Sequence, residues 1–456
     1  MSDRLSPILV KELRQGIRSR LFTGSFLLVQ ALLFLFGLSF VLSDSLQKDA
    51  TAGSAFFWMM LALPLVVLVP ASASQAVERE VSGRTLELLL LTRLSSYRIV
   101  FGKWASVVLQ TSLLLVSALP YVILRYFLGG IDVVGELQTM GGLLLGSGLL
   151  AGVAMGFWSL NVPRLAKWAA VLLLIWMAPF LILMAASPHG TFSSPPGLGS
   201  LAWIYGTIVM LMMIEAAAAR IGPPSENHWT RVRALALLSF GIAFLYDGMA
   251  AVVAAAAAIG ISLPAMIASM SQNGRPLRRL HEPFHRGSAL RRLALFPFSP
   301  SWPGGVAFSA LMILLAPLLP ALRGDIGPVA WIAVATTLLF PVALVRGAFA
   351  GSRPLLLYIV ILVLSSFPIY VYAFAQSAET SSLSVFLQSV SGFFAPLALV
   401  VELAHPDGYT GAAPARAILL IVTATSALVI LLAARREWTR IASLFSLGPV
   451  GGEAER

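Results

Sequence analysis

The residues best suited to metal chemistry lie in one short segment, His281-Glu282-Pro283-Phe284-His285. It matches His-Glu-x-x-His, the pattern in which one helix presents two histidines to zinc and the glutamate acts as a general base. Because the chain has only five histidines, this match makes an integral-membrane zinc metalloprotease an alternative to be tested. Pro283 disfavours helical geometry at Glu282 and removes a backbone donor. We therefore expect a solvated basic linker here and no bound metal.

Nucleotide chemistry is not indicated by any motif in the chain. The phosphate-binding pattern Gly-x-x-x-x-Gly-Lys-Ser/Thr is absent, since Gly102-Lys103 lacks both the upstream glycine and the following hydroxyl residue. The chain also has no cysteine, which excludes disulfides and cysteine-based nucleophiles or metal sites. We expect no catalytic residue and no cofactor bound by this chain.

A second group of candidates consists of carboxylates within or beside apolar stretches, where a charge is costly and often functional. Glu215 lies near the end of one stretch and could pair with Arg220, whereas Asp247 interrupts another and could form a simple turn. Glu402 follows a broken stretch. Asp247 or Glu402 could carry ions or protons in a secondary transporter, and each of the three carboxylates could instead have no direct role. Arg125, near the end of a further stretch, could extend its guanidinium to that surface.

The composition indicates what must position these residues. Of 456 residues, 58% are hydrophobic and 11% are charged, against about 25% charged in a typical soluble domain. The mean hydropathy of +0.88 and the repeated apolar runs indicate a polytopic bundle of transmembrane helices, whose backbone groups are satisfied internally. The alternation of period two that is typical of a transmembrane barrel is absent. We expect an all-α fold with about 10–12 membrane segments, re-entrant ones included.

The N-terminal half contains a basic amphipathic segment and a series of candidate spans. Residues 4–20 place Ile8, Leu9, Leu13 and Ile17 on one face, which predicts an interfacial helix. The first apolar run is longer than the apolar part of a signal peptide, so we interpret it as a retained span. The candidate spans of this half are 22–42, 55–77, 104–128, 137–160, 168–187 and 200–219.

The C-terminal half is less regular. Residues 234–270 are too long for one span and short for two, so we predict a tight or re-entrant hairpin that turns near Asp247. Residues 386–404, interrupted by Gly392 and Pro396, are predicted to enter and leave the membrane on one side. The remaining spans are predicted at 304–322, 328–346, 354–375 and 414–434. The predicted divisions are a membrane half at 1–220, a hairpin and basic linker at 221–303, a second membrane half at 304–440 and a tail at 441–456.

The net charge of +11 is concentrated in the predicted loops, where it indicates topology and contact with anionic lipid rather than nucleic-acid binding. With the spans above, all of the 31 basic residues except Lys48, Arg125, Arg323 and Arg416 fall on one side of the membrane. The positive-inside rule makes that side cytoplasmic and places both termini there. We expect a multi-pass protein of the cytoplasmic (inner) membrane.

The densest group of charges lies between the second and third predicted spans. The segment Glu78–Lys103 reads EREVSGRTLELLLLTRLSSYRIVFGK and is predominantly basic, so it is predicted to be cytoplasmic. Ser82-Gly83 interrupts any helix that enters from the membrane, after which residues 85–94 could form a short interfacial helix. Such a segment could be a docking site for a cytoplasmic partner, and a simple connecting loop is the alternative.

Four groups of residues in this segment follow one another in a characteristic order. They are Glu78-Arg79-Glu80, Gly83-Arg84-Thr85-Leu86-Glu87, Leu90-Leu91-Thr92 and Ile99-Val100-Phe101-Gly102-Lys103. The order resembles the first cytoplasmic loop of ABC-2 type ABC transporter permeases, and residues 7–14 resemble the opening helix of that family. The similarity covers roughly residues 1–160, and the C-terminal half has no second copy of the string.

The resemblance implies the permease subunit of an ATP-driven exporter, which forms the translocation path. In that family a dimer of permeases, identical or paralogous, works with two copies of a separate ATPase subunit that uses ATP and Mg²⁺. The resemblance also implies that helices at 5–20 and 84–94 contact this ATPase. Membrane lipid is the other expected partner. The partner-coupling residues that it implies are Glu78, Arg79, Glu80, Gly83, Thr85, Leu86, Glu87, Thr92, Gly102 and Lys103.

Overall fold

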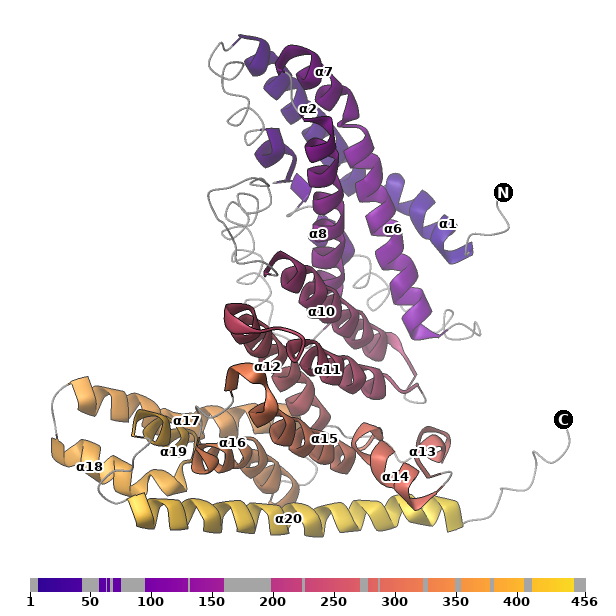
Figure 1. Ribbon diagram of the computed structural model, residues 1–456. Helices are drawn as coiled ribbons and strands as arrows, with labels where there is room; N and C mark the ends of the chain where they lie inside the picture. Colours follow the sequence, from indigo (N-terminus) through magenta and orange to yellow (C-terminus); the bar gives the residue numbers. More distant parts are fainter. Residues whose placement is uncertain are drawn as a thin grey trace, which may run out of the picture. The chain divides into compact units, whose positions relative to one another are not determined.

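The protein is helical in every regular element that the structure describes (Figure 1). The computed structural model describes residues 7–42, 57–62, 64–65, 69–74, 95–129, 132–159, 198–223, 226–270, 278–285, 288–322, 327–348, 354–377, 381–405 and 412–446. Within these ranges eight helices are long and apolar enough to cross a membrane, or up to nine if one bent pair counts as a span. The predicted all-α, multi-pass bundle is therefore confirmed. The predicted span 168–187 and part of 55–77 lie outside the described residues.

The chain divides into two compact units, Met1–His228 and Trp229–Arg456, called unit 1 and unit 2 here. The side chains at the centre of unit 1 are apolar and come from several helices, among them Leu33, Phe57, Leu115, Met155 and Ile214. Among the described residues, unit 1 has the helices α1 (Pro7–Ile17), α2 (Arg20–Leu42), α6 (Ser96–Val116), α7 (Leu119–Gly129), α8 (Val133–Ser159) and α10 (Leu198–Ile221), and residues 57–62 and 69–74 are helical as well.

The third span begins earlier than its apolar run predicts. Helix α6 starts at Ser96, so Gly102 and Lys103 lie inside a helix and not in the predicted loop. The prediction ended the loop at the charge of Lys103, but this side chain is buried and paired. The preceding residues Ile99 and Val100 are also buried, which extends the membrane helix toward its N-terminus.

Three glycines at intervals of four residues let α8 approach its neighbours closely. Gly148 accepts a hydrogen bond from the Trp104 indole at 2.8 Å. A Cβ on Gly152 would meet the side chain of Met210, and a Cβ on Gly156 would overlap the backbone of Met213 in α10. Small residues at this spacing are how membrane helices gain backbone contact, because lipid provides little hydrophobic drive for helix association.

A buried ion pair links α7 to α8. The Arg125 guanidinium donates to both carboxylate oxygens of Glu136, at 3.0 and 3.1 Å, and lies 4.5 Å from the centroid of the Phe57 ring. Arg125 is only 2% exposed. The prediction that Arg125 reaches the membrane surface is therefore wrong, because Glu136 in the first turn of α8 supplies the counter-charge inside the bundle.

Unit 2 opens with the predicted hairpin. Helix α11 (Trp229–Ala243) and helix α12 (Gly248–Met270) are joined by a turn that contains Asp247, as predicted. Gly248 has a φ of +58°, a left-handed conformation that glycine adopts at little cost. Ala251 donates its backbone N–H to the Asp247 carbonyl, which begins α12.

The predicted basic linker is more ordered than expected. It contains α13 (Arg278–His285), α14 (Ala289–Leu295) and η2 (Phe296–Phe298), followed by α15 (Trp302–Leu315). The chain bends by 89° between residues 289–298 and 302–318. Ser301 caps α15 by accepting from the Gly304 N–H, and this cap explains why α15 starts before the predicted residue 304.

The bend is held by Arg233 of α11, which is fully buried. Its guanidinium donates to the carbonyl oxygens of Pro297, Ser299 and Ser301 and to the Ser269 hydroxyl. Among the described residues no carboxylate pairs with it. The converging carbonyls of the bend therefore take the place of a counter-ion, and the bend is fixed relative to α11 and α12.

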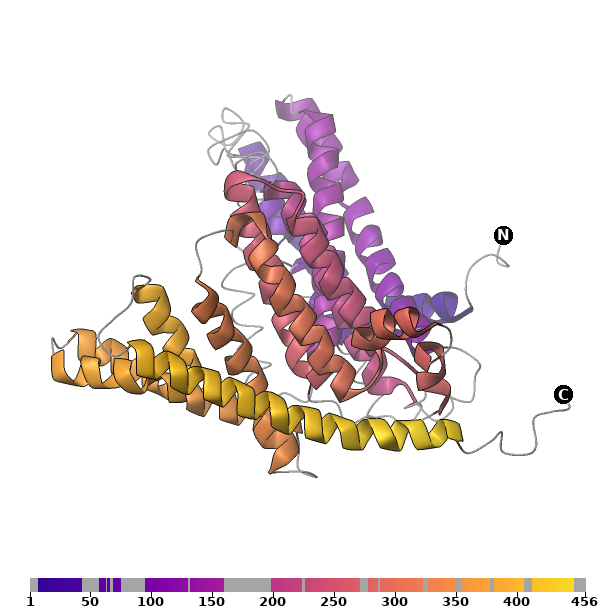
Figure 2. The same ribbon diagram turned by 60° about the horizontal axis from the view of Figure 1, so that its bottom comes forward.

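The rest of unit 2 follows the predicted spans, with one long helix at the end (Figure 2). The predicted break at Gly392 and Pro396 is confirmed: η5 (Ser391–Phe393) separates two helices, and a Cβ on Gly392 would overlap the Ala415 carbonyl. The last helix continues past residue 434 to Ser446, because no glycine or proline interrupts it. The remaining elements are η3 (Ala316–Leu318), η4 (Pro320–Leu322), α16 (Pro328–Gly347), α17 (Pro354–Ser377), α18 (Ser381–Val390), α19 (Ala395–Ala404) and α20 (Ala412–Ser446).

The glycine packing of α8 gives a testable prediction. Gly156→Ala should destabilise the protein by about 1–3 kcal/mol, because the new methyl group overlaps the Met213 backbone. Gly142→Ala is the matched control on the same helix, since nothing lies within 4 Å of its Cβ position. Thermal unfolding in detergent should show a lower midpoint for Gly156→Ala only. An unchanged midpoint for Gly156→Ala would contradict this packing.

Candidate functional site

Polar and charged groups of unit 1 gather along α6 where α1 and the end of α10 meet it. Four residues of this group are buried, and three of them have ionisable side chains, which are costly to bury in a membrane bundle. We call the group the polar end; it consists of Glu12, Ser96, Lys103, Glu215, Glu226 and His228.

An ion pair fastens the amphipathic helix α1 to the membrane span α6. Lys103 Nζ lies 3.1 Å from Glu12 Oε1, and the side chains are 5% and 16% exposed. Removing one partner of such a buried pair leaves an uncompensated charge, which is far more costly than removing both. The pair therefore couples the position of α1 to that of α6.

The face of α1 that meets α6 differs in part from the predicted apolar face. Leu9, Glu12, Leu13 and Gly16 recur at helical spacing and are partly buried. A Cβ on Gly16 would overlap the Gln110 side chain, so glycine permits the close approach of the two helices. The predicted amphipathic helix is confirmed, but its inner face is centred on the charge of Glu12.

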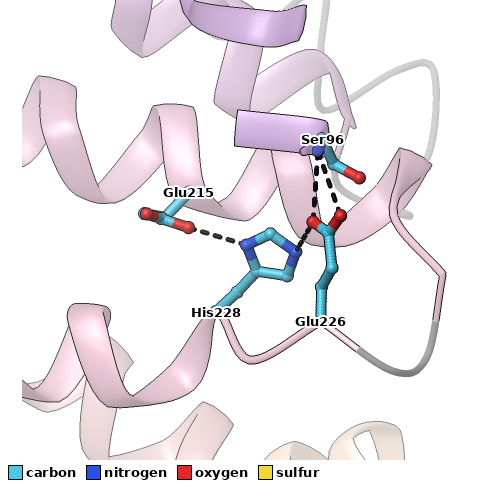
Figure 3. Close-up of polar contacts among 4 residues, drawn as sticks. All are labelled: Ser96, Glu215, Glu226 and His228. Carbon is cyan, nitrogen blue, oxygen red and sulfur yellow. Dashed lines mark hydrogen bonds and ion pairs between the residues drawn. The ribbon is translucent and has the colours of Figure 1, made fainter. Parts of the chain in front are cut away.

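A second set of contacts joins α10, the segment before α11 and the first residue of α6 (Figure 3). His228 Nδ1 lies 2.7 Å from Glu215 Oε2, and His228 Nε2 lies 3.3 Å from Glu226 Oε2. The backbone N–H of Ser96 donates to both Glu226 carboxylate oxygens, at 3.3 and 3.1 Å. One imidazole thus lies between two carboxylates, and one of these carboxylates holds the start of a span.

Glu226 acts as an anion at the N-terminus of α6. The first N–H groups of a helix have no intrahelical acceptor, and the helix dipole favours negative charge there. The N-cap residue Ser95 makes no side-chain cap hydrogen bond, so the acceptor comes from a residue 130 positions away. The position of α6 is thereby tied to the segment that follows α10.

His228 can donate to both carboxylates only as an imidazolium, since a neutral imidazole has a single N–H. In the structure His228 Nδ1 makes a hydrogen bond with Glu215 Oε2, whereas His228 Nε2 makes none with the described residues. Serine, histidine and glutamate also occur in hydrolase triads, but the fully buried Ser96 hydroxyl has no hydrogen-bond partner here. His228 therefore does not activate Ser96 as a nucleophile in this arrangement.

Only part of the predicted partner-coupling set is described by the structure. Gly102 and Lys103 lie in α6, and Lys103 belongs to the polar end. The others lie outside the described residues: Glu78, Arg79, Glu80, Gly83, Thr85, Leu86, Glu87 and Thr92.

The predicted intramembrane carboxylates have different surroundings. Glu215 is 2% exposed and contacts His228, which the sequence did not suggest as its partner. Asp247 is exposed in the turn of its hairpin. Glu402 accepts two hydrogen bonds from the Arg416 guanidinium, at 2.7 and 2.9 Å. Only Glu215 belongs to the polar end.

The predicted non-helical linker around Pro283 is wrong. Residues Arg278–His285 form α13, and Pro283 is accommodated because a helix of two turns loses only one of its few backbone hydrogen bonds there. His281 is buried and Glu282 is partly exposed, while the His285 side chain lies outside the described part. Among the residues that were searched, no group of three His, Asp or Glu side chains could hold a metal ion.

Sequence reasoning missed three residues that organise the helices. His228 and Glu226 lie in a short polar segment after Gly222-Pro223, whose only signal was its position between two apolar runs. From the sequence, Arg233 was counted among the basic residues of the cytoplasmic loops. In the structure its side chain is buried. Their partners are distant in sequence, so no local pattern could identify these contacts.

Comparison with known proteins does not assign this site to a family. No family model matches the sequence, no curated protein matches it, and no solved structure matches the fold. A functional assignment therefore depends on the geometry and on the resemblance of the sequence.

The ion pair between α1 and α6 predicts that its loss loosens α1. Glu12→Gln should raise the rate of tryptic cleavage at Lys11 and Arg14 by about tenfold, because ~1.4 kcal/mol of lost local stability changes the open population by that factor. The charge exchange Glu12→Lys with Lys103→Glu should recover part of the resistance. Arg18→Gln, which removes an exposed charge beside α1, is the control. Equal cleavage of the Glu12→Gln variant and the unmodified chain would exclude a stabilising role for the pair.

Proposed function

We propose that this chain is the membrane-spanning subunit of an ABC-2 type exporter and couples to a separate ATPase subunit at the polar end of unit 1. The observation that carries the proposal is the tethering of α1 to α6 through Glu12 and Lys103. Lys103 is also the last residue of the string that resembles the family's cytoplasmic loop. The resemblance and the tether thus point to the same helix.

The tether supplies a mechanical route for coupling. A partner that pushes on α1 also moves α6, because a buried ion pair and the close contact at Gly16 join the two helices. Glu226 in turn ties the start of α6 to the segment after α10. Binding of ATP and Mg²⁺ by the ATPase would shift the bundle between inward-facing and outward-facing states, provided that the ATPase contacts differ between the two states.

The proposed assembly contains two permease chains and two ATPase subunits. The exposed face of α1 carries Lys11, Arg14 and Gln15, which are available to a partner. On this proposal the α1 end of α6 and both termini lie in the cytoplasm, in keeping with the basic charge of these segments. The predicted residues from Glu78 to Thr92 would complete the docking surface.

One observation favours a second candidate, a proton-coupled secondary transporter. Glu215 and His228 are buried and in contact, and the half-buried Glu226 lies 3.3 Å from His228, so carboxylates and an imidazole lie together as in the proton relays of transporters. Asp247 and Glu402, the carriers suggested by sequence, fit this role less well, because one lies in an exposed turn and the other is paired with Arg416. This candidate predicts gradient-driven transport that continues without any ATPase and is lost in His228→Gln.

Purification of the tagged chain from its membrane in mild detergent tests the proposal. We expect an ATP-hydrolysing subunit to co-purify with it in equal amount. Glu78→Ala with Glu80→Ala, and separately Lys103→Met, should reduce its recovery. Asp132→Ser is the matched control, since it removes a carboxylate at the other end of the α6–α7 span while serine still caps α8. Recovery of the ATPase undiminished by Glu78→Ala with Glu80→Ala would contradict the docking surface, and gradient-driven transport without an ATPase would favour the second candidate.

A further inference from the structure

Unit 2 contains a groove that joins apolar walls to two exposed arginines. It lies between α13, α14 and the C-terminal part of α20 (Figure 1) and has a volume of about 540 Å³. This is within the range of roughly 300–1,000 Å³ that is typical of sites for small ligands. Phe296 and Trp438 meet edge to face across it, with ring centroids 5.4 Å apart. The groove is therefore defined by residues of one unit.

The walls and the rim of the groove differ in chemistry. Phe284, Leu293 and Leu431 line it with apolar surface. Arg292 and Arg435 also line it, and both side chains are exposed. Within the described part of the chain neither guanidinium takes part in an ion pair. A ligand that fills the groove would thus meet both apolar side chains and two cationic groups.

The groove lies where α20 changes from apolar to charged. Between Arg416 and Arg435 the helix carries no charged residue, and Arg435 begins its basic C-terminal part. Trp438 is 40% exposed, and tryptophan is enriched where a helix leaves the hydrocarbon region. On α14, Leu290 and Leu293 are 79% and 72% exposed beside two arginines, a pattern suited to the membrane interface. On both α14 and α20, apolar side chains lie next to arginines. A phospholipid likewise joins apolar acyl chains to a charged headgroup.

We propose that this groove is a binding site for an anionic glycerophospholipid. One acyl chain lies against Phe296, Leu431 and Trp438, and the phosphate lies between Arg292 and Arg435. Arginine suits this role because its planar fork of donors matches phosphate oxygens. Inorganic phosphate alone would leave the apolar walls uncovered, and a zwitterionic lipid has no net charge to complement the two guanidinium groups. The proposal does not depend on an ATPase partner.

Native mass spectrometry of the delipidated full chain tests this site. Phosphatidylglycerol and phosphatidylcholine with the same acyl chains are titrated separately, and inorganic phosphate is added as a competitor. We expect phosphatidylglycerol to bind more tightly than phosphatidylcholine, and millimolar phosphate to displace little of it. Each arginine near an anionic headgroup contributes about fivefold, so Arg292→Gln with Arg435→Gln should weaken phosphatidylglycerol binding about thirtyfold.

Two further variants separate the groove from general surface charge. Arg291→Gln with Arg440→Gln removes two exposed arginines of the same helices that do not line the groove, and should change the affinity less than about twofold. Ala434→Trp fills the groove while both rim arginines remain, and should abolish specific binding. Thermal unfolding in lipid-free detergent verifies that each variant is folded.

Three results would overturn the proposal. They are equal affinity for the two lipids, full displacement by inorganic phosphate, and undiminished binding in the rim-arginine variant. A dimer in the same titration that Ala434→Trp converts to monomer would instead assign the groove to a second copy of the chain.

Discussion

The architecture depends on how a chain with few charges pairs those that it buries. Moving an ion out of water costs several kcal/mol even after relaxation, so a buried charge persists only where partners satisfy it. In unit 1, Arg125 pairs with Glu136 and Lys103 pairs with Glu12. Each pair joins two separate helices, whose backbone hydrogen bonds are all made within the helix itself. These contacts specify which helices lie together, where apolar packing alone would allow many arrangements.

Unit 2 uses a different solution at its main bend. Arg233 donates hydrogen bonds to backbone carbonyl oxygens of the bend, where the chain leaves helical geometry between η2 and α15. Arginine suits this role, since the donors of its planar guanidinium are spread over three nitrogens and reach carbonyls that lie apart. Near the other end of α20, Glu402 and Arg416 form the paired arrangement again.

The pairs in unit 1 also determine what motion the bundle can transmit. Two apolar helices packed in lipid can slide past each other at little cost. A buried ion pair between them resists such sliding, because its two charges must stay in contact. Helix α1 is amphipathic, carries exposed charges and is fixed to α6 through Glu12. A force applied to α1 from outside the membrane therefore reaches the interior of the bundle. This is the physical basis for proposing that coupling takes place at the polar end.

The sequence was sufficient for features that depend on local pattern. Apolar runs predicted the spans, the turn at Asp247 and the break at Gly392, because length and helix-breaking residues are local properties. It could not predict that Lys103 lies within a span, since its counter-charge Glu12 is 91 residues away. The cluster around His228 was missed for the same reason. Helical α13 was missed because the cost of one proline depends on helix length.

Cross-linking from the exposed face of α1 tests the central claim most directly. The chain has no cysteine, so Gln15→Cys places a single photoactivatable reagent on that face. The account predicts a cross-link to a separate ATP-binding subunit, with a yield that changes when ATP and Mg²⁺ are trapped on that subunit. Asp132→Cys, at the far end of unit 1, should give no such product. Cross-links from Gln15→Cys only to lipid or to a second copy, or an equal ATPase product from both positions, would contradict coupling through α1.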